Sequence, residues 1–523
     1  MVSNDDTGFT IVTIWPAPSV GPVDIAHRAE YSGGWIKMIE IREDSMDNLR
    51  AKLKGVCDRA VENNLWRQRR CFNLIPSETT PSLIVKMCEI SDPAGRYAEH
   101  RTMKGKEIYF YQGTDFIRDI EEETRTAIAG FFGCEEAELR PVSGQMANEV
   151  VFKAVTRFLN RDSEGSMKRM SLVMNNDLTK GGHLSSQPMG ALFNYVEADP
   201  ETGKEAVINF PIRADNPYRI DQAKMAELIR ERKPDLIVFG KSMFIYPEPV
   251  SEASEAVREL DPKPIIMYDM AHVLGLYGAF QKPLEEGADI VTGSTHKTFF
   301  GPQRGVVVSN FVKGHNLRKL WIDIKGRAFP GSTSNHHLGT LLGLLMAAHE
   351  MNAFKDEYQS EVGKNAKAFA KALSEQGLKV EGDPADGYTQ THQVIVRVRD
   401  HGIGEEVARR LEDNNIVCNY QALPDDESFL QSSGIRTGVQ EMTRFGMKEE
   451  DFARLAELVA DVITKGKDVK KEVAAYRSRF PEMKYCLPPV ESSKLGARIL
   501  ESVFPTSDYA AMFAERLSEF SKA

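Results

Sequence analysis

The chain is poor in cysteine, and the cysteines that it has are scattered. Six cysteines occur among 523 residues, and no two of them form a Cys-x-x-Cys pair. A structural zinc site, a dithiol redox site or another metal centre is therefore not expected. Scattered cysteines in a long chain are typical of a reducing compartment, so we expect a cytoplasmic location.

Long apolar runs and blocks of like charge are also missing. The longest apolar helical stretch, residues 338–348, is too short to span a bilayer. The start Met1-Val2-Ser3-Asn4-Asp5-Asp6 lacks the basic residues that open a signal peptide. The 66 basic and 76 acidic residues give a formal charge of −10, which argues against a nucleic-acid surface. We expect neither a membrane nor a nucleic acid as partner.

What is present is the composition of an ordinary globular protein, with 41% apolar and 27% charged residues. Between about 125 and 310, helical stretches alternate with short apolar runs. These runs are 171–174, 236–239, 264–267, 290–291 and 305–308. The alternation predicts an α/β domain with a mostly parallel sheet, and the unbroken apolarity of the runs predicts that both sheet faces are covered.

The rest of the chain suggests further parts. We expect a strand at 9–15, a helix from 45, a long helix through 338–346, and a smaller domain with helices near 355–376, 403–412 and 449–465. Strands of that smaller domain are expected at 394–398 and 416–418. The predicted boundaries are an N-terminal extension at 1–65, a large domain at 66–335, a small domain at 336–490 and a helical extension at 491–523.

The segment Ala288 to Thr298 ends an apolar strand-like run with hydroxyl groups, a histidine and Lys297. A lysine is rarely placed at the end of an apolar strand unless something binds it. A Schiff base to pyridoxal phosphate (PLP) is one such reason. Asp269 ends the preceding apolar run, and an acid there would keep the pyridine nitrogen of PLP protonated.

Other segments fit the same cofactor and also allow ordinary interpretations. Ser143-Gly144-Gln145 opens a helix, either as a phosphate site or as a simple N-cap by Ser143. His183 would lie on the cofactor ring or be a hydrogen-bonded loop residue. His272 would contact the phenolic oxygen of PLP, and His296 would be structural or would contact the phosphate.

Arg436 stands in the apolar and glycine-rich segment Gly434-Ile435-Arg436-Thr437-Gly438. A guanidinium binds a substrate carboxylate in a two-pronged way, although a surface ion pair is the alternative. Residues 96–111 concentrate aromatic and ionisable side chains, which could supply acid–base groups to a pocket.

Together these segments resemble the serine hydroxymethyltransferase family of fold-type I PLP enzymes. The resemblance runs in order from about 65 to 490 through seven short motifs: Leu74-Ile75-Pro76-Ser77-Glu78, Tyr97-Ala98-Glu99, Ser143-Gly144-Gln145-Met146-Ala147-Asn148, Gly181-Gly182-His183-Leu184, Asp269-Met270-Ala271-His272, Thr295-His296-Lys297-Thr298 and Gly434-Ile435-Arg436. It implies an aspartate aminotransferase-like large domain with a mostly parallel seven-stranded sheet and a smaller α/β C-terminal domain.

The resemblance also implies roles. Lys297 would carry the cofactor aldehyde, Asp269 would pair with the pyridine nitrogen, and His183 would stack on the ring. The other implied cofactor contacts are Ser143, Gly144, Gln145, Ser242, His272, Thr295, His296, Ser334 and Asn335. Arg436 and Ser77 would bind the amino-acid carboxylate. Tyr97, Glu99 and one of Tyr109 or Tyr111 would come from the partner subunit of a homodimer, which could pair further into a tetramer.

Several positions depart from the family pattern around the folate site. Gln145 replaces a serine, residues 332–336 lose a glycine pair, and Gln421 replaces an asparagine that contacts folate. Residues 301–303, 389–394 and 438–443 are similar instead to the family's L-threonine transaldolase branch. These changes put tetrahydrofolate as a second cofactor in doubt.

The expected reaction makes or breaks the Cα–Cβ bond of a β-hydroxy-α-amino acid, with threonine, serine or glycine and an aldehyde as substrates. Glu99, or a water that it orients, is the expected base. Bond cleavage would leave a glycyl carbanion. An aldolase would protonate this carbanion, and a transaldolase would add it to a second aldehyde. A hydroxymethyltransferase would transfer the released formaldehyde to tetrahydrofolate. A PLP-binding protein without turnover is the alternative from another class.

Overall fold

The computed structural model describes residues 31–103, 106–161 and 167–520. Contacts divide the chain into two compact units between Trp66 and Arg67. The described part of the first unit is the long helix α1 (Tyr31–Leu65), which begins well before the helix expected from residue 45. The strand expected at 9–15 lies outside the described residues. Within the described ranges, no helix is both long and apolar enough to cross a membrane.

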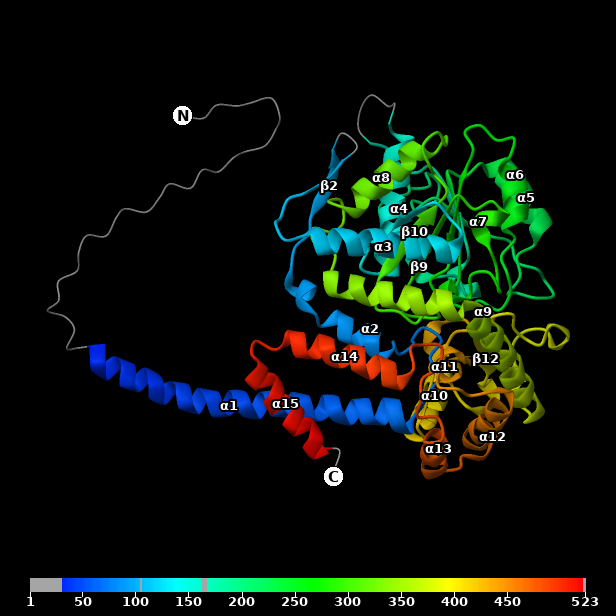
Figure 1. Ribbon diagram of the computed structural model, residues 1–523. Coiled ribbons are helices and arrows are strands. Elements are labelled where there is room, and N and C mark those ends of the chain that lie inside the picture. The colour runs from blue at the N-terminus through cyan, green and yellow to red at the C-terminus, as the bar shows by residue number, and fades with distance from the viewer. Residues whose placement is uncertain (1–30, 104–105, 162–166, 521–523) are drawn as a thin grey trace, which may run out of the picture. The chain divides into compact units, whose positions relative to one another are not determined.

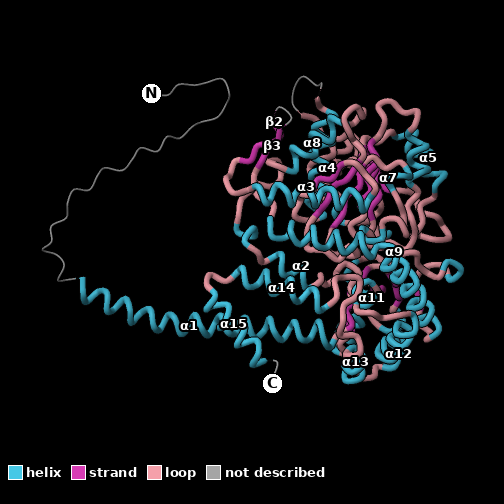
Figure 2. The backbone as a smooth tube through the Cα atoms, in the orientation of Figure 1, coloured by secondary structure: helices cyan, strands magenta, loops and turns pink. Residues whose placement is uncertain are grey.

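A seven-stranded sheet forms the centre of the second unit. Figures 1 and 2 show its strands with helices around them. Its strands, in spatial order, are β4 (Glu136–Glu138), β10 (Gly305–Ser309), β9 (Ile290–Ser294), β8 (Ile265–Asp269), β7 (Leu236–Gly240), β5 (Val173–Asn175) and β6 (Val207–Asn209). The five strands from β9 to β6 are parallel to their neighbours, and β10 is antiparallel to both β9 and β4. The predicted fold class, a mostly parallel seven-stranded sheet in an α/β protein, is confirmed.

Both faces of this sheet are buried. Val306 and Val308 on β10 belong to a core shared with α3 (Asp115–Phe132) and α9 (Leu338–Glu375). Val307 between them belongs to a second core with α4 (Gly144–Leu159) and α8 (Arg318–Ala328). Successive side chains of a strand point to opposite faces, so helices on both sides explain why the runs are apolar throughout.

A second, antiparallel sheet follows later in the chain. Its spatial order is β11 (Lys379–Val380), β12 (Gln393–Arg397), β15 (Gly434–Gly438) and β14 (Asn419–Gln421). The other helices of the unit are α2 (Leu83–Glu89), α5 (Gln222–Arg232), α6 (Val250–Val257), α7 (Pro283–Glu286), α10 (Gly404–Asp413), α11 (Gln440–Arg444), α12 (Glu449–Lys465), α13 (Lys470–Arg477), α14 (Pro489–Val503) and α15 (Ser507–Phe520). The predicted domain boundaries within this unit stay predictions.

Two small pairings complete the strands. β1 (Phe72–Asn73) lies parallel to β13 (Ile416–Val417). β2 (His100–Met103) and β3 (Lys106–Tyr109) form a hairpin that Figure 2 shows apart from the central sheet. The helix α14, near the C-terminal end of the described chain, packs against α2, as Figure 1 shows.

The second unit also differs from the expected elements. The helices expected at 338–346 and 355–376 are one continuous helix, α9, since no proline interrupts the segment. The strands β1, β2, β3, β4, β6, β11 and β14 were not expected, because each has only two to four residues and so short a run carries no readable periodicity.

Candidate active site

The predicted cofactor residues meet where the parallel strands of the central sheet end. Asp269 is the last residue of β8, and Lys297 follows β9 by three residues. β8 and β9 are parallel neighbours, with Asp269 opposite Thr292. The carboxyl ends of neighbouring parallel strands lie at one edge of the sheet, where open α/β folds bind their ligands.

Lys297 is a buried amine, only 9% exposed. Its Nζ lies 3.5 Å from Ser294 Oγ, and no carboxylate of the described chain forms an ion pair with it. Burial lowers the pKa of Lys297 to about 8, with the Arg436 charge adding to this effect and Asp269 opposing it. An appreciable share of the amine is therefore neutral near neutral pH, as a nucleophilic lysine needs to be.

Asp269 is a buried carboxylate held by three donors. It accepts hydrogen bonds from His183 Nδ1 at 2.5 Å, Asn148 Nδ2 at 2.8 Å and the Ala271 amide at 2.9 Å. Burial by itself would raise the pKa of Asp269, but His183 and these hydrogen bonds hold the pKa below its ordinary value. Asp269 is thus ionised, as a partner of a protonated pyridine nitrogen must be.

Two histidines of the site keep a ring nitrogen without a partner. The Nδ1 atoms of His272 and His296 are buried and form no hydrogen bond with any described residue. Burial lowers the pKa of His272 well below its usual range and that of His296 to about 4. The His272 ring stands edge-on to His183, with ring centres 5.4 Å apart. Both rings are neutral and have capacity for a ligand.

The start of α4 is pressed against the end of β9. Ser143 caps this helix, and its Oγ accepts from the Met146 amide at 3.1 Å, so the N-cap interpretation holds. A Cβ on Gly144 would lie 2.1 Å from Ser294 Oγ, so this position has no room for a side chain. Gln145 is exposed, and the Thr295 hydroxyl donates to the Pro302 carbonyl at 2.6 Å.

Arg436 reaches the site from β15 of the second sheet. The side chain is buried, with Nη1 donating to the Ser242 carbonyl at 2.7 Å and Nε to Asn419 Oδ1 at 3.3 Å. No carboxylate pairs with it among the described residues, so the surface ion pair is not found. Burial lowers the pKa of Arg436 to about 10, which leaves it a cation. Ser77, a half-buried residue, follows Pro76, whose carbonyl accepts from His392.

Two residues of the site were not assigned from the sequence. Asn148 bridges Asp269 and Thr292, donating to the first and accepting from the second at 2.6 Å. Its place one helical turn after Gly144 was a usable signal. His392 is fully buried, with a pKa lowered by burial to about 3, and it lies close enough to Lys297 and Arg436 to feel their charges. A lone histidine before a strand gave no comparable signal.

The remaining predicted residues do not meet this cluster. The described residues provide no hydrogen bond or ion pair from Tyr97, Glu99, Tyr109, Tyr111, Ser334 or Asn335 to Lys297, Asp269 or Arg436. Tyr97 and Tyr111 are exposed, with ring centres 5.4 Å apart. Tyr109 instead donates to the buried carboxylate of Glu121 at 2.7 Å, and Asn335 donates to the Arg96 carbonyl at 2.7 Å.

PLP fits this donor set. Lys297 would supply the amine, Asp269 the anion for the pyridine nitrogen, and His272 and His296 buried ring nitrogens without a partner among the described residues. No cluster of three or more metal-ligating side chains occurs within residues 31–103, 106–161 and 167–520. The buried Arg436 cation adds a place for a carboxylate next to the amine.

Comparison with known proteins identifies the family of the chain. A family model for serine hydroxymethyltransferase matches residues 53–459. The serine hydroxymethyltransferase of Staphylothermus marinus is 37% identical over 83% of this chain and 93% of its own, and that of Aeropyrum pernix is 38% identical over 85% and 95%. The crystal structure of L-threonine transaldolase from Pseudomonas fluorescens in its internal aldimine state superimposes with a TM-score of 0.74 and 25% identity, over 88% of this chain and 99% of that one. The chain therefore belongs to the serine hydroxymethyltransferase family of fold-type I, PLP-dependent enzymes.

Proposed function

We propose that this enzyme makes or breaks the Cα–Cβ bond of a β-hydroxy-α-amino acid without tetrahydrofolate, as a threonine transaldolase or aldolase. The observation that carries the amino-acid part is Arg436, a buried cation without a carboxylate partner among the described residues, near the Lys297 amine. An α-amino acid offers the anion and the amine that this pair would recognise.

The residues divide the work as follows. PLP, when bound, accepts the electron pair released at Cα. Arg436 would hold the substrate carboxylate, and Asp269 would keep a proton on the ring nitrogen. Glu99 of the partner subunit, or a water molecule that it orients, would accept the proton of the β-hydroxyl while the Cα–Cβ bond breaks and an aldehyde leaves. The electron pair at Cα then takes a proton, which gives an aldolase, or forms a bond to a second aldehyde, which gives a transaldolase.

Independence from folate is supported by the positions that depart from the family pattern. Gln421 stands where that pattern has a folate-contacting asparagine, at the end of β14. Asn335, in the loop that lacks the glycine pair, donates its amide to the Arg96 carbonyl. The structural similarity to an L-threonine transaldolase supports the same choice. The names of the curated relatives favour the second candidate, transfer of a hydroxymethyl group between serine and tetrahydrofolate.

We also propose a homodimer that shares its active sites. Tyr97 and Tyr111 are about half exposed and form an aromatic pair on the surface, without a link to the Lys297 site of their own chain. Tyr109 is engaged with Glu121, which leaves Tyr111 as the tyrosine free to enter a partner's site.

The test compares threonine and serine as substrates, each with and without tetrahydrofolate, followed by a screen of added aldehydes. We expect acetaldehyde from threonine at a rate that tetrahydrofolate does not change, and a new β-hydroxy-α-amino acid when a second aldehyde is supplied. Lys297→Ala, given the same aldehydes, corrects for uncatalysed condensation. A tenfold or greater rise of serine turnover with tetrahydrofolate would replace this proposal by the hydroxymethyltransferase.

A further inference from the structure

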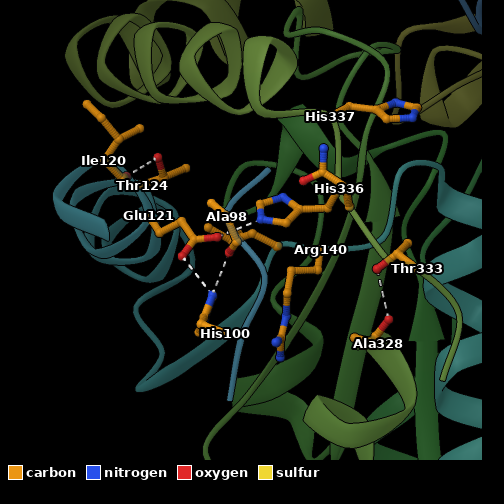
Figure 3. Close-up of polar contacts among 12 residues, drawn as sticks. Ala98, His100, Ile120, Glu121, Thr124, Arg140, Ala328, Thr333, His336 and His337 are labelled. Carbon is orange, nitrogen blue, oxygen red and sulfur yellow. Dashed lines mark hydrogen bonds and ion pairs between the residues drawn. The ribbon is translucent and has the colours of Figure 1, made fainter. Parts of the chain in front are cut away.

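Away from Lys297, the chain contains a buried polar network centred on Glu121 of α3. Glu121 is 4% exposed and accepts hydrogen bonds from Tyr109 Oη at 2.7 Å and from His336 Nε2 at 2.6 Å. His100 Nδ1 lies 3.6 Å from the same carboxylate. Figure 3 shows Glu121 between His100 and His336, which reach it from different segments. A buried carboxylate with this many donors is held in one place.

The two partners of His336 determine which of its ring nitrogens carries the proton. Its Nδ1 lies 3.0 Å from Arg304 Nη2, and a guanidinium only donates, so Nδ1 accepts. The ring proton is therefore on Nε2 and is donated to Glu121. Burial lowers the pKa of His336 despite the opposing carboxylate, so the ring is neutral. Burial by itself would raise the pKa of Glu121, but His336, His100 and Tyr109 lower it to about 2, so the carboxylate is ionised.

The network links three segments that the proposed reaction uses. Tyr109 ends β3 and pairs with His100 across the base of the hairpin, with ring centres 4.4 Å apart. Glu99 directly precedes His100, and Tyr111 follows Tyr109 by two positions, so both lie next to this base. His336 ends the loop of residues 331–336. The Arg304 backbone exchanges hydrogen bonds with Thr295, two residues before Lys297, through its carbonyl at 3.0 Å and its amide at 3.1 Å.

Besides this carboxylate, the described part of the hairpin is held by apolar packing of Tyr109 against a small cluster that includes Ala98, Ile117 and Leu338. A cavity of about 510 Å³ is lined by His100, Arg101 and Glu107 of the hairpin on one side and by residues of α8 on the other. Residues 106–108 of β3 are exposed. The Glu121 carboxylate is the polar contact that ties the base of the hairpin to α3, through Tyr109 and His100.

We propose that Glu121 is a positioning residue for the reaction: it fixes the base of the hairpin, and with it the flanking residues Tyr97, Glu99 and Tyr111 that serve the partner's site, relative to the 331–336 loop of their own chain. This inference rests on the proposed function. Glu121 forms no hydrogen bond or ion pair with Lys297, Asp269 or Arg436 in the described chain, so its effect passes through Tyr109 and His336.

The test compares Glu121→Leu, Glu121→Gln and the control Glu123→Leu. Glu123 lies on the same helix and is exposed, in a pair with the exposed His349. We expect Glu121→Leu to lower kcat by about tenfold or more while KM for the amino acid changes less than about threefold, because Arg436 and Ser77 lie on other elements. Glu121→Gln, which can still accept from His336, should keep a third or more of kcat, and Glu123→Leu should keep all of it.

A second measurement separates this inference from the proposed function. Hydrogen exchange should become faster in Glu121→Leu at both the hairpin and the 331–336 loop, and Tyr109→Phe should speed exchange only at the hairpin and lower kcat by about threefold. If wild type turns over neither threonine nor serine, the proposed function fails, and the exchange pattern still decides this inference. If PLP-loaded Glu121→Leu keeps kcat within twofold, or if Glu121→Leu does not fold and Tyr109→Phe keeps full kcat and wild-type exchange, the inference is wrong.

Discussion

The Lys297 site and the Glu121 network are both buried and polar, yet they handle their polar atoms in opposite ways. At the Lys297 site, ring nitrogens of His272 and His296 and the charge of Arg436 find no matching partner among the described residues. In the Glu121 network, every side-chain oxygen and nitrogen of Glu121, His336 and Tyr109 is hydrogen-bonded, and Nε of the adjoining Arg304 is a buried atom without a partner among the described residues. Unsatisfied buried groups carry a free-energy cost that a ligand removes, whereas a satisfied network fixes the shape of the fold.

Of the changes that test this difference between the two regions, Lys297→Ala should have the largest effect. A site built around this amine should lose turnover below detection, and the absorbance of bound PLP should change to that of the free aldehyde. Lys467→Ala, at an exposed residue paired with Asp461, serves as the control and should match wild type. Retention of full activity by Lys297→Ala would disprove the role of the amine.

Arg436→Lys tests the unpaired cation of the same site. The variant keeps the charge and loses the two-pronged geometry, so we expect kcat/KM for the amino acid to fall about 10- to 100-fold, mainly through KM. Arg454→Lys, in an exposed ion pair, should be silent. An effect on kcat alone, with KM unchanged, would mean that Arg436 does not hold the substrate.

The lowered pKa of Lys297 should make cofactor binding at this site depend on pH. Burial places this pKa at about 8, so the share of neutral amine, the form that attacks the PLP aldehyde, shrinks as the pH falls below that value. The rate at which apoenzyme captures PLP should fall about tenfold per pH unit below about 8 and level off above it.

A variant can check the cause of this pH dependence. Arg436→Leu removes a charge that lowers the pKa of Lys297, so the midpoint should move to higher pH. The rate of PLP capture, followed by absorbance from pH 6 to 10, measures both effects. A rate that does not vary across this range would contradict a Lys297 amine that titrates near pH 8.

The two regions also differ in how far the sequence predicts them. Lys297 and Asp269 follow apolar runs that become β9 and β8, so parallel strands bring them together in a way that local pattern predicts. Glu121 and His336 are 215 residues apart and lie in segments without a shared pattern. Their meeting depends on how α3 packs against α9, which is a tertiary contact that no local periodicity encodes.

Exposure separates residues that look alike in the sequence. Tyr109 and Tyr111 stand two positions apart, and the sequence does not say which of them serves a partner's site. The structure gives the first to Glu121 and leaves the second on the surface, because β3 ends between them. Asn148, in contrast, could be predicted from the sequence. It lies one helical turn after Gly144 on α4, and this spacing brings its amide to Asp269.

The two tyrosines provide the finest test of the comparison. Tyr109→Phe removes a hydrogen bond to an ionised, buried carboxylate, so we expect a loss of about 1.5–3 kcal/mol in the free energy of unfolding. Tyr111→Phe removes an exposed hydroxyl and should change that free energy by less than about 0.5 kcal/mol. Urea unfolding of both variants, measured side by side, gives the two values. If instead Tyr111→Phe were the destabilising change and Tyr109→Phe the silent one, the hairpin would be held at its exposed end and the Glu121 carboxylate would not be its anchor.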